Sequence, residues 1–240
     1  MLSPEIKLFD NPDQVAEAFA EELFALVSNS PGVFHLALSG GSTPKLLFDL
    51  LAREYQSKMP WGKIHFWWGD ERCVPPADNE SNYKMTHEHL LMKVPVDDRQ
   101  VHRIQGELEP GKACELYIRE ILTQVNQRRG LPAFDLIMLG MGNDGHTASI
   151  FPDQMDLLET DRICETAIHP QSGQIRVSLT GRVMNNAERV FFLVTGKAKA
   201  ERIKQIVNGD EMAVTLPVYH IRPLTGKLVF YIDRDAASGI

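Results

Sequence analysis

The sequence has few features of a secreted or membrane protein. Cysteine occurs at three positions of the 240-residue chain: Cys73, Cys114 and Cys164. An odd number of cysteines at irregular spacing argues against a disulfide framework and is typical of a reducing compartment. No window approaches about 18 consecutive apolar residues, the length of a membrane-spanning helix, and residues 1–7 lack the cationic start and apolar run of a signal peptide. We therefore expect a cytoplasmic protein that has no membrane partner.

An excess of positive charge is also missing. The chain has 25 Lys and Arg against 32 Asp and Glu, a formal net charge of −7, and its basic residues are scattered. This pattern argues against a nucleic-acid partner. The motifs H-E-x-x-H, C-x-x-C and G-x-S-x-G are absent, so neither a zinc site nor a serine nucleophile elbow is indicated. We expect neither a metal nor a cofactor.

Hydrophobic patterns predict an alternation of helices and strands. Apolar residues at helical spacing predict a helix over residues 11–28 and another after Pro44, and further helices are expected over 80–92, 110–129 and 197–207. Short apolar runs predict strands, which are expected at 33–38, 63–68, 134–139, 176–179, 190–195 and 228–232. This order predicts an α/β fold with three αβα layers, in which helices cover both faces of a mostly parallel, Rossmann-like open sheet. Since no linker interrupts the chain, we expect a single domain over residues 1–240.

Three polar motifs follow predicted strands: Ser39–Lys45 (SGGSTPK), Gly69–Arg72 (GDER) and Gly140–His146 (GMGNDGH). Ligands of open α/β sheets bind beyond the carboxyl ends of the strands. Loops that follow different strands can meet at this edge of the sheet. We therefore expect the three motifs to form one site.

The first two motifs can bind an anion. Two glycines before a helix start allow close backbone approach, and the first amides of the helix attract negative charge. Arg72 can bind a phosphate through two parallel hydrogen bonds. Each motif also has a structural explanation, a tight turn before a capped helix in the first case and a salt-bridged surface turn in the second. Spacing alone leaves both explanations open.

The third motif has two functional interpretations. Gly140, Gly142 and Gly145 match the dinucleotide fingerprint, with Glu165 near the place of its ribose-binding carboxylate. Against this, Asp144 would repel a pyrophosphate, and Pro152 follows too soon for an uninterrupted crossover helix. In the other interpretation His146 exchanges a proton with water, and Asp144 fixes its tautomer. For His146 taken alone, an ordinary loop histidine is the simpler explanation.

Over nearly its whole length the sequence resembles the 6-phosphogluconolactonase family, within the superfamily that also contains glucosamine-6-phosphate deaminases. The resemblance lies in the stretches Leu38–Pro44, Trp68–Pro75, Glu80–Tyr83, Leu139–Pro152, Arg176–Thr180, Thr195–Ala200 and Asp233–Ala237. Two departures are small, because Glu80 stands where the family usually has Asp and Val218 stands where Ala is commoner.

The resemblance implies a metal-independent hydrolase that opens the lactone ring of 6-phospho-D-glucono-1,5-lactone, the second step of the oxidative pentose phosphate pathway. It implies that His146 is the general base and that Asp144 orients it. The remaining site residues would bind the small-molecule substrate: Ser39, Gly40, Gly41, Ser42, Arg72 and Lys199 at the phosphate, Arg176 as a helper, and Asp70 at the sugar hydroxyls. Loop amides near Gly41 or Gly142 are candidates for stabilising the oxyanion. A monomer or a homodimer is expected.

Two other functions remain to be weighed. In the deaminases, the glutamate that supports the histidine aligns with Phe151, and a tyrosine aligns with Arg72; both differences argue against amino-sugar isomerisation. A non-catalytic sugar-phosphate-binding protein is the other alternative, and the intact pair of Asp144 and His146 argues against it.

Overall fold

A six-stranded sheet, in which every neighbouring pair of strands is parallel, forms the centre of the structure. The structure is a computed structural model that describes residues 4–240. The first three residues, on which the expectation about a signal peptide partly rests, lie outside the described residues. The strands, in their order across the sheet, are β1 (Glu5–Phe9), β11 (Lys227–Asp233), β10 (Arg189–Val194), β7 (Leu136–Leu139), β2 (Phe34–Leu38) and β3 (Ile64–Trp68).

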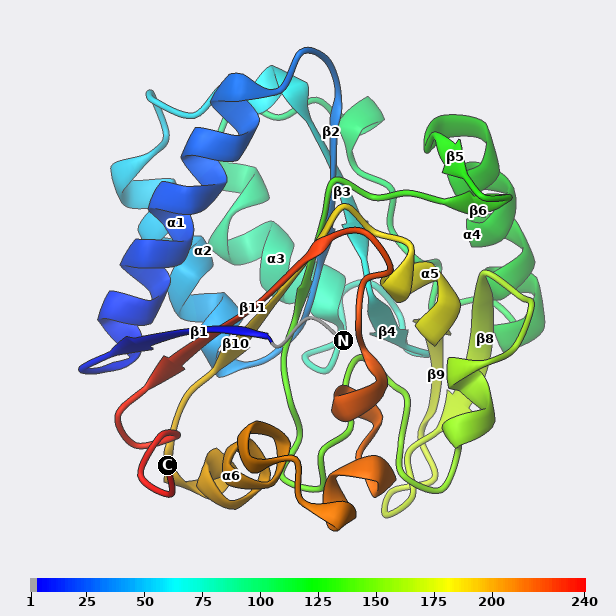
Figure 1. Cartoon of the computed structure of the whole chain (residues 1–240). Helices are drawn as coiled ribbons and strands as arrows, with labels where there is room; N and C mark the ends of the chain where they lie inside the picture. The colour runs from blue at the N-terminus through cyan, green and yellow to red at the C-terminus, as the bar shows by residue number, and fades with distance from the viewer. Residues whose placement is uncertain (1–3) are drawn as a thin grey trace.

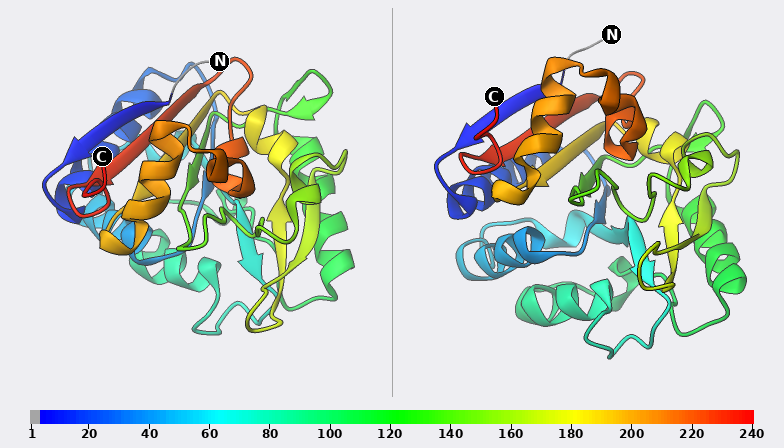
Figure 2. Two further views of the ribbon diagram at one scale, coloured as in Figure 1. Left: turned by 60° about the horizontal axis from the view of Figure 1, so that its bottom comes forward. Right: turned by 90° about the horizontal axis from the view of Figure 1, so that it is seen from below.

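Helices cover both faces of this sheet. Helices α1 (Pro12–Asn29), α2 (Ser42–Glu54) and α3 (Asn82–His89) lie together on one side, and α4 (Pro110–Gln124), α5 (Gly181–Asn185) and α6 (Ala200–Asn208) lie on the other (Figures 1 and 2). The three-layer α/β prediction is thereby confirmed. Short 3-10 helices complete the chain: η1 (Trp61–Lys63), η2 (Leu91–Lys93), η3 (Asp98–Gln100), η4 (Met155–Leu158), η5 (Lys197–Lys199), η6 (Glu211–Thr215) and η7 (Pro217–His220). Within residues 4–240, no helix combines the length and apolar character needed to cross a bilayer.

A second, antiparallel sheet lies beside α4. It consists of β4 (Asp70–Arg72), β9 (Ile175–Leu179) and β8 (Cys164–Ile168). The predicted strand at 176–179 therefore exists, but it does not join the parallel sheet. The two sheets connect at Gly69, whose N–H donates to the carbonyl of Leu38 while its own carbonyl accepts from the N–H of Leu179. The chain thus passes from β3 into the small sheet at the edge where the first polar motif begins.

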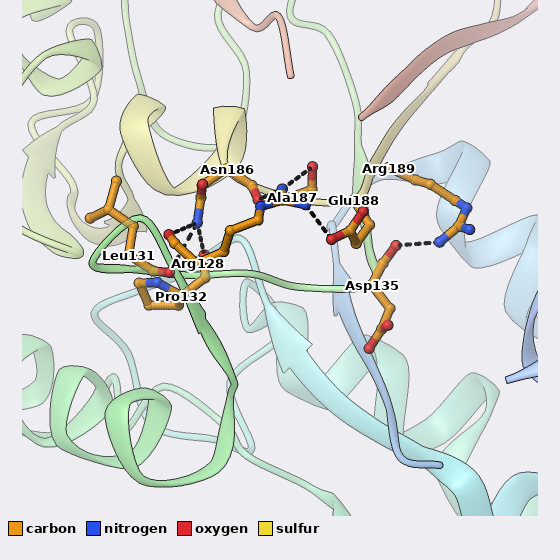
Figure 3. A network of polar contacts seen from close by, with 8 residues as sticks. All are labelled: Arg128, Leu131, Pro132, Asp135, Asn186, Ala187, Glu188 and Arg189. Atoms are coloured by element: carbon orange, nitrogen blue, oxygen red, sulfur yellow. Dashed lines mark hydrogen bonds and ion pairs between the residues drawn. The ribbon is translucent and has the colours of Figure 1, made fainter. Parts of the chain in front are cut away.

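The helix predicted over 110–129 is five residues too long at its end, because α4 stops at Gln124. The next residues form a hairpin of β5 (Gln127–Arg128) and β6 (Leu131–Pro132), whose turn residues have φ values of +56° and +76°. Side-chain contacts from distant parts of the chain hold this hairpin (Figure 3). The carboxamide of Asn186 donates to the carbonyls of Arg128, Leu131 and Pro132, and the Arg128 guanidinium pairs with Glu188. These long-range bonds outweigh the local helical pattern.

A cluster of histidines lies between β2, β3 and α4, with His35 and His102 buried and His65 partly buried. His65 Nδ1 lies 2.8 Å from His102 Nε2, and His102 Nδ1 lies 2.6 Å from the Glu120 carboxylate. The indole N–H of Trp67 donates to His35 Nδ1 at 3.2 Å, which leaves that nitrogen as an acceptor. Burial, followed by the repulsion of the rings of His65 and His102, lowers the pKa of His35 to about 4, and burial also lowers the pKa of His65. His35 and His65 therefore stay largely uncharged at neutral pH.

Because of this cluster, we expect the free energy of unfolding to decrease as the pH falls from 6.5 towards 4. In that window the unfolded chain binds a proton at His35 and the folded chain does not, so acid favours the unfolded state. Between pH 7 and pH 5 the contribution of His35 amounts to at most about 2 kcal/mol. Denaturant unfolding of the wild type and of His35→Asn at both pH values measures it. The variant lacks the titrating ring and should show the weaker pH dependence; equal dependence in both proteins would contradict the assignment.

Candidate active site

The carboxyl ends of β10, β7, β2 and β3, which are adjacent in the sheet, surround a cavity of about 390 Å³. The crossovers from β2 and from β7 lead to opposite sides of the sheet, so the ends of these two strands form a topological switch point, where open α/β sheets bind ligands. Nine of the predicted site residues line the cavity: Ser39, Gly40, Gly41, Ser42, Asp70, Arg72, His146, Arg176 and Lys199. The tenth, Asp144, does not line the cavity but contacts His146, which does.

The imidazole of His146 is held on two sides. Its Nδ1 lies 2.6 Å from Asp144 Oδ1, and the same oxygen accepts from the main-chain N–H of His146 at 3.1 Å. The buried ring of Phe151 packs against the imidazole at a centroid distance of 4.9 Å. Within residues 4–240, no group forms a hydrogen bond with Nε2 of His146, and the side chain lines the cavity. Nε2 is therefore the nitrogen that can act on a bound molecule.

The ionised state of Asp144 is favoured. Partial burial by itself would raise the pKa of this carboxyl, but the hydrogen bond and the charge of His146 outweigh burial and hold the pKa at about 2. A carboxylate hydrogen-bonded to Nδ1 requires the proton on that nitrogen and leaves Nε2 as the basic one. The arrangement suits an imidazole that accepts a proton at its cavity side.

The loop that carries the dyad of Asp144 and His146 depends on Gly142. The N–H of Gly142 donates to the carbonyl of His146 at 2.8 Å. A methyl group added to Gly142 would lie 2.1 Å from His146 Nδ1 and 2.6 Å from Asp144 Oδ1. Glycine is therefore needed for the dyad to occupy its position. The N–H of Gly142 is bonded within the loop, and the other loop amides near Gly41 and Gly142 stay candidates for stabilising the oxyanion.

Three cations face the cavity with few partners. The Nζ of Lys199 donates to the carboxamide of Asn143 at 2.6 Å, and the guanidinium of Arg176 lies 5.7 Å from the ring centre of Phe151. Burial lowers the pKa of both Arg176 and Lys199. The guanidinium of Arg72 donates to the carbonyl of Glu80, while its Nε is buried without a hydrogen-bond partner among the described residues. Partly desolvated cations and an unused buried donor are what a bound anion would stabilise.

Asp70 supplies negative charge to the same cavity. Asp70 is 4% exposed, and its Oδ2 accepts from the hydroxyl of Ser149 at 2.6 Å. The carboxamide of Asn82 donates to the main-chain carbonyl of Asp70 at 2.9 Å. Oδ1 has only a long contact, 3.5 Å from the carboxamide nitrogen of Asn82, so Oδ1 is the oxygen better placed to accept a hydrogen bond from a hydroxyl of a ligand.

The loop Ser39–Ser42 leads into α2, and the helix has no side-chain cap. Gly41 occupies the N-cap position with a φ of +116°, a conformation that favours glycine. The first-turn amides of this 13-residue helix therefore lack a capping side chain and remain available to an anion. The hydroxyl of Thr43 lies 2.7 Å from that of Thr195, which joins the first turn of α2 to the residue after β10.

Sequence reasoning missed several residues of the cavity. Asn82, Asn143 and Thr195 line it but were not predicted as site residues, and Thr43 and Ala148 were also missed. Asn82, Asn143 and Thr195 lie inside the stretches Glu80–Tyr83, Leu139–Pro152 and Thr195–Ala200, which carry the family resemblance, and the signal was that each has a short polar side chain.

The dinucleotide interpretation does not fit the structure. After β7 the chain makes a turn closed by a bridge between Thr147 and Ile150, and η4 is the next helical segment among the described residues. No crossover helix starts at the glycines, as the fingerprint requires. Glu165 lies on β8, where it pairs with Arg162 at 2.9 Å. These observations leave no role for Gly140, Gly142 and Gly145 as a pyrophosphate loop.

Comparisons with known proteins agree on one family. The family model described as glucosamine-6-phosphate isomerases/6-phosphogluconolactonase matches residues 10–230. A 6-phosphogluconolactonase of Treponema pallidum is 39% identical over 219 residues, 91% of this chain and 90% of that protein. The solved structure of the 6-phosphogluconolactonase of Trypanosoma brucei matches with a TM-score of 0.91 at 25% identity and full coverage of both chains. A monomeric glucosamine-6-phosphate deaminase matches with a TM-score of 0.83 over 98% of this chain and all of that one, but at 17% identity, which shows the shared fold alone.

Proposed function

The chain belongs to the family of glucosamine-6-phosphate isomerases and 6-phosphogluconolactonases, and on this premise we propose that it hydrolyses 6-phospho-D-glucono-1,5-lactone to 6-phosphogluconate. The observation that carries the proposal is the imidazole of His146, which is held by Asp144 at the wall of a cavity that also contains three cations. The test is to supply the lactone and follow acid release above the spontaneous rate.

In the proposed reaction, Nε2 of His146 takes a proton from water while the water oxygen attacks the lactone carbonyl carbon. Negative charge then resides on the former carbonyl oxygen. When this intermediate collapses, the bond between the carbonyl carbon and the ring oxygen breaks, and His146 returns its proton to the ring oxygen. One water is consumed, and the proton balance closes. Asp144 accepts from Nδ1–H throughout and stabilises the imidazolium. Since a lactone is an activated ester, the reaction needs no covalent intermediate.

The two ends of the cavity would divide the binding of the substrate. Arg72, Arg176 and Lys199, together with the Ser39–Ser42 loop, would bind the phosphate, and Asp70 would accept sugar hydroxyls. The unpaired Nε of Arg72 and the uncapped start of α2 support the assignment of the phosphate. Binding at this remote group positions the reacting carbon near His146.

Deamination of an amino sugar is the weaker candidate. The carboxylate expected beside its histidine is replaced here by Phe151, whose ring packs on His146. In addition, the cationic side chain of Arg72 stands where the deaminases have a tyrosine. Acid production from the lactone, without ammonia release from glucosamine 6-phosphate, distinguishes the two activities. A single domain over residues 1–240, a cytoplasmic location and a monomer or homodimer stay predictions.

For Arg72→Ala, we expect a KM for the phosphorylated lactone that is raised about 10- to 100-fold, because the loss of a charge-assisted hydrogen bond costs about 1.5–3 kcal/mol. The kcat should change much less. Steady-state kinetics with the phosphorylated and the unphosphorylated lactone measure the effect. The loss should be smaller for the unphosphorylated substrate, and equal losses for both would contradict a role at the phosphate.

A further inference from the structure

Glu71 lies between two cavity residues, Asp70 and Arg72, but the proposed function gives it no role. Its side chain is 2% exposed and does not line the cavity. No ion pair of the described residues includes it. Burial raises the pKa of this carboxyl, and hydrogen bonds to the carboxylate oppose the shift. A buried carboxyl without a cation needs other donors to be tolerated.

Those donors come from the start of α3 and from β4. Oε1 of Glu71 accepts from the N–H groups of Arg72 and Asn82, both at 2.8 Å. Oε2 accepts from the N–H of Tyr83 at 2.8 Å and from the hydroxyl of Ser81 at 3.0 Å. One side chain thus satisfies first-turn amides of α3 while it bonds to its own strand. The position of α3 relative to β4 is fixed at this point.

Asn82, the first residue of α3, touches two parts of the cavity. It is 3% exposed, and its carboxamide donates to the carbonyl of Asp70 at 2.9 Å. The same carboxamide lies against Gly40, since a methyl group added to Gly40 would be 1.9 Å from Asn82 Oδ1. The carboxamide occupies the space that a side chain at position 40 would need. It therefore contacts both the Ser39–Ser42 loop and the strand that carries Asp70 and Arg72.

We propose that Glu71 and Asn82 are positioning residues for the phosphate end of the substrate. Glu71 fixes the start of α3 on β4, and Asn82 thereby holds the Ser39–Ser42 loop at its distance from Arg72. The proposal rests on the proposed function, because it takes that loop and Arg72 as the phosphate site. When a loop is already held in its binding conformation, substrate binding does not have to supply the free energy of ordering it. The effect should appear mainly in KM.

The test uses Glu71→Gln and Asn82→Ala in the full chain. We expect each variant to raise the KM for 6-phosphogluconolactone about 5- to 20-fold, with kcat within about 3-fold of the wild type. The Kd of 6-phosphogluconate, measured by calorimetry, should rise by a similar factor. The matched control is Glu109→Gln, since Glu109 caps α4 by accepting from the N–H groups of Gly111 and Lys112 and does not line the cavity. We expect both Glu109→Gln and Glu71→Gln to lose thermal stability, but only the control to keep the KM of the wild type.

A double-mutant cycle tests the contact between Asn82 and Gly40. Gly40→Ala alone should raise the KM, because the new methyl group displaces the carboxamide. In the Asn82→Ala background, we expect the increase in KM caused by Gly40→Ala to be at least about 3-fold smaller. The outcomes distinguish the two proposals. If the wild type binds 6-phosphogluconate but does not hydrolyse the lactone, the proposed function is overturned, and the Kd values still test the positioning residues. If KM and Kd are unchanged in Glu71→Gln and Asn82→Ala, or if the effects in the cycle are additive, the inference about the positioning residues is overturned.

Discussion

His146→Ala is expected to fold normally and to lose about 100- to 10,000-fold in kcat, the range that positioned acid–base catalysis contributes. The imidazole bonds through Nδ1 to Asp144 and presents Nε2 to the cavity, so the variant keeps the cations but lacks the base. The KM should change much less than kcat. Stopped-flow measurement of acid release, corrected for spontaneous lactone opening, gives both constants.

The matched control for this variant is His169→Ala. His169 packs against the same Phe151 ring at a centroid distance of 5.3 Å, but it does not line the cavity. Its loss removes a histidine from the same neighbourhood and should leave kcat within a few-fold of the wild type. Turnover of His146→Ala at the wild-type rate would remove His146 from the mechanism.

The second large effect is expected for Gly142→Ala. A methyl group at this position would lie 2.1 Å from His146 Nδ1, so the imidazole and Asp144 must move away from each other or from the cavity. Displacement of a catalytic group by about 1 Å can cost on the order of 100-fold in rate. We therefore expect kcat to fall by about that factor while the Kd of 6-phosphogluconate stays close to the wild-type value.

Gly32→Ala is the control for the loss of a glycine. A methyl group at Gly32 would meet no atom within 4 Å, so the substitution should leave kcat unchanged. If Gly142→Ala retained full turnover, the dyad of His146 and Asp144 would not depend on the close approach of this backbone. The free energy of unfolding of both variants, measured in denaturant, separates a local displacement from a general loss of fold.

The strands that carry the site could be predicted from the sequence because they are continuous apolar runs. Residues 34–38, 64–68 and 136–139 are almost wholly buried in a parallel sheet, where both faces are covered. Since each run ends in a glycine-containing polar loop, the rule that ligands bind beyond the carboxyl ends of strands placed the motifs together. The strands β1, β4 and β8 were missed. In β1 and β8 the apolar residues are interrupted by polar ones, and β4 consists of charged residues.

Contacts between distant segments explain what the sequence could not predict. The chain leaves the helical pattern after Gln124 because Asn186, more than 50 residues away, bonds to the hairpin carbonyls. In the same way, Asn82 lies in the cavity only because Glu71 receives the first amides of α3. No local pattern shows these pairings, whereas the pair of Asp144 and His146 lies within one short loop. This is why the contact between Asp144 and His146 could be predicted from the sequence, whereas the contacts of Glu71 and Asn82 around the Ser39–Ser42 loop could not.

The most direct test of the account is a crystal structure of the protein with bound 6-phosphogluconate. The central claim is that His146 acts on the carbon that the lactone ring activates while the cations hold the phosphate. It predicts the product carboxylate within hydrogen-bond distance of His146 Nε2 and the phosphate among Arg72, Arg176, Lys199 and the Ser39–Ser42 loop. A product bound in the reverse orientation, or bound with its carboxylate remote from His146, would contradict the account.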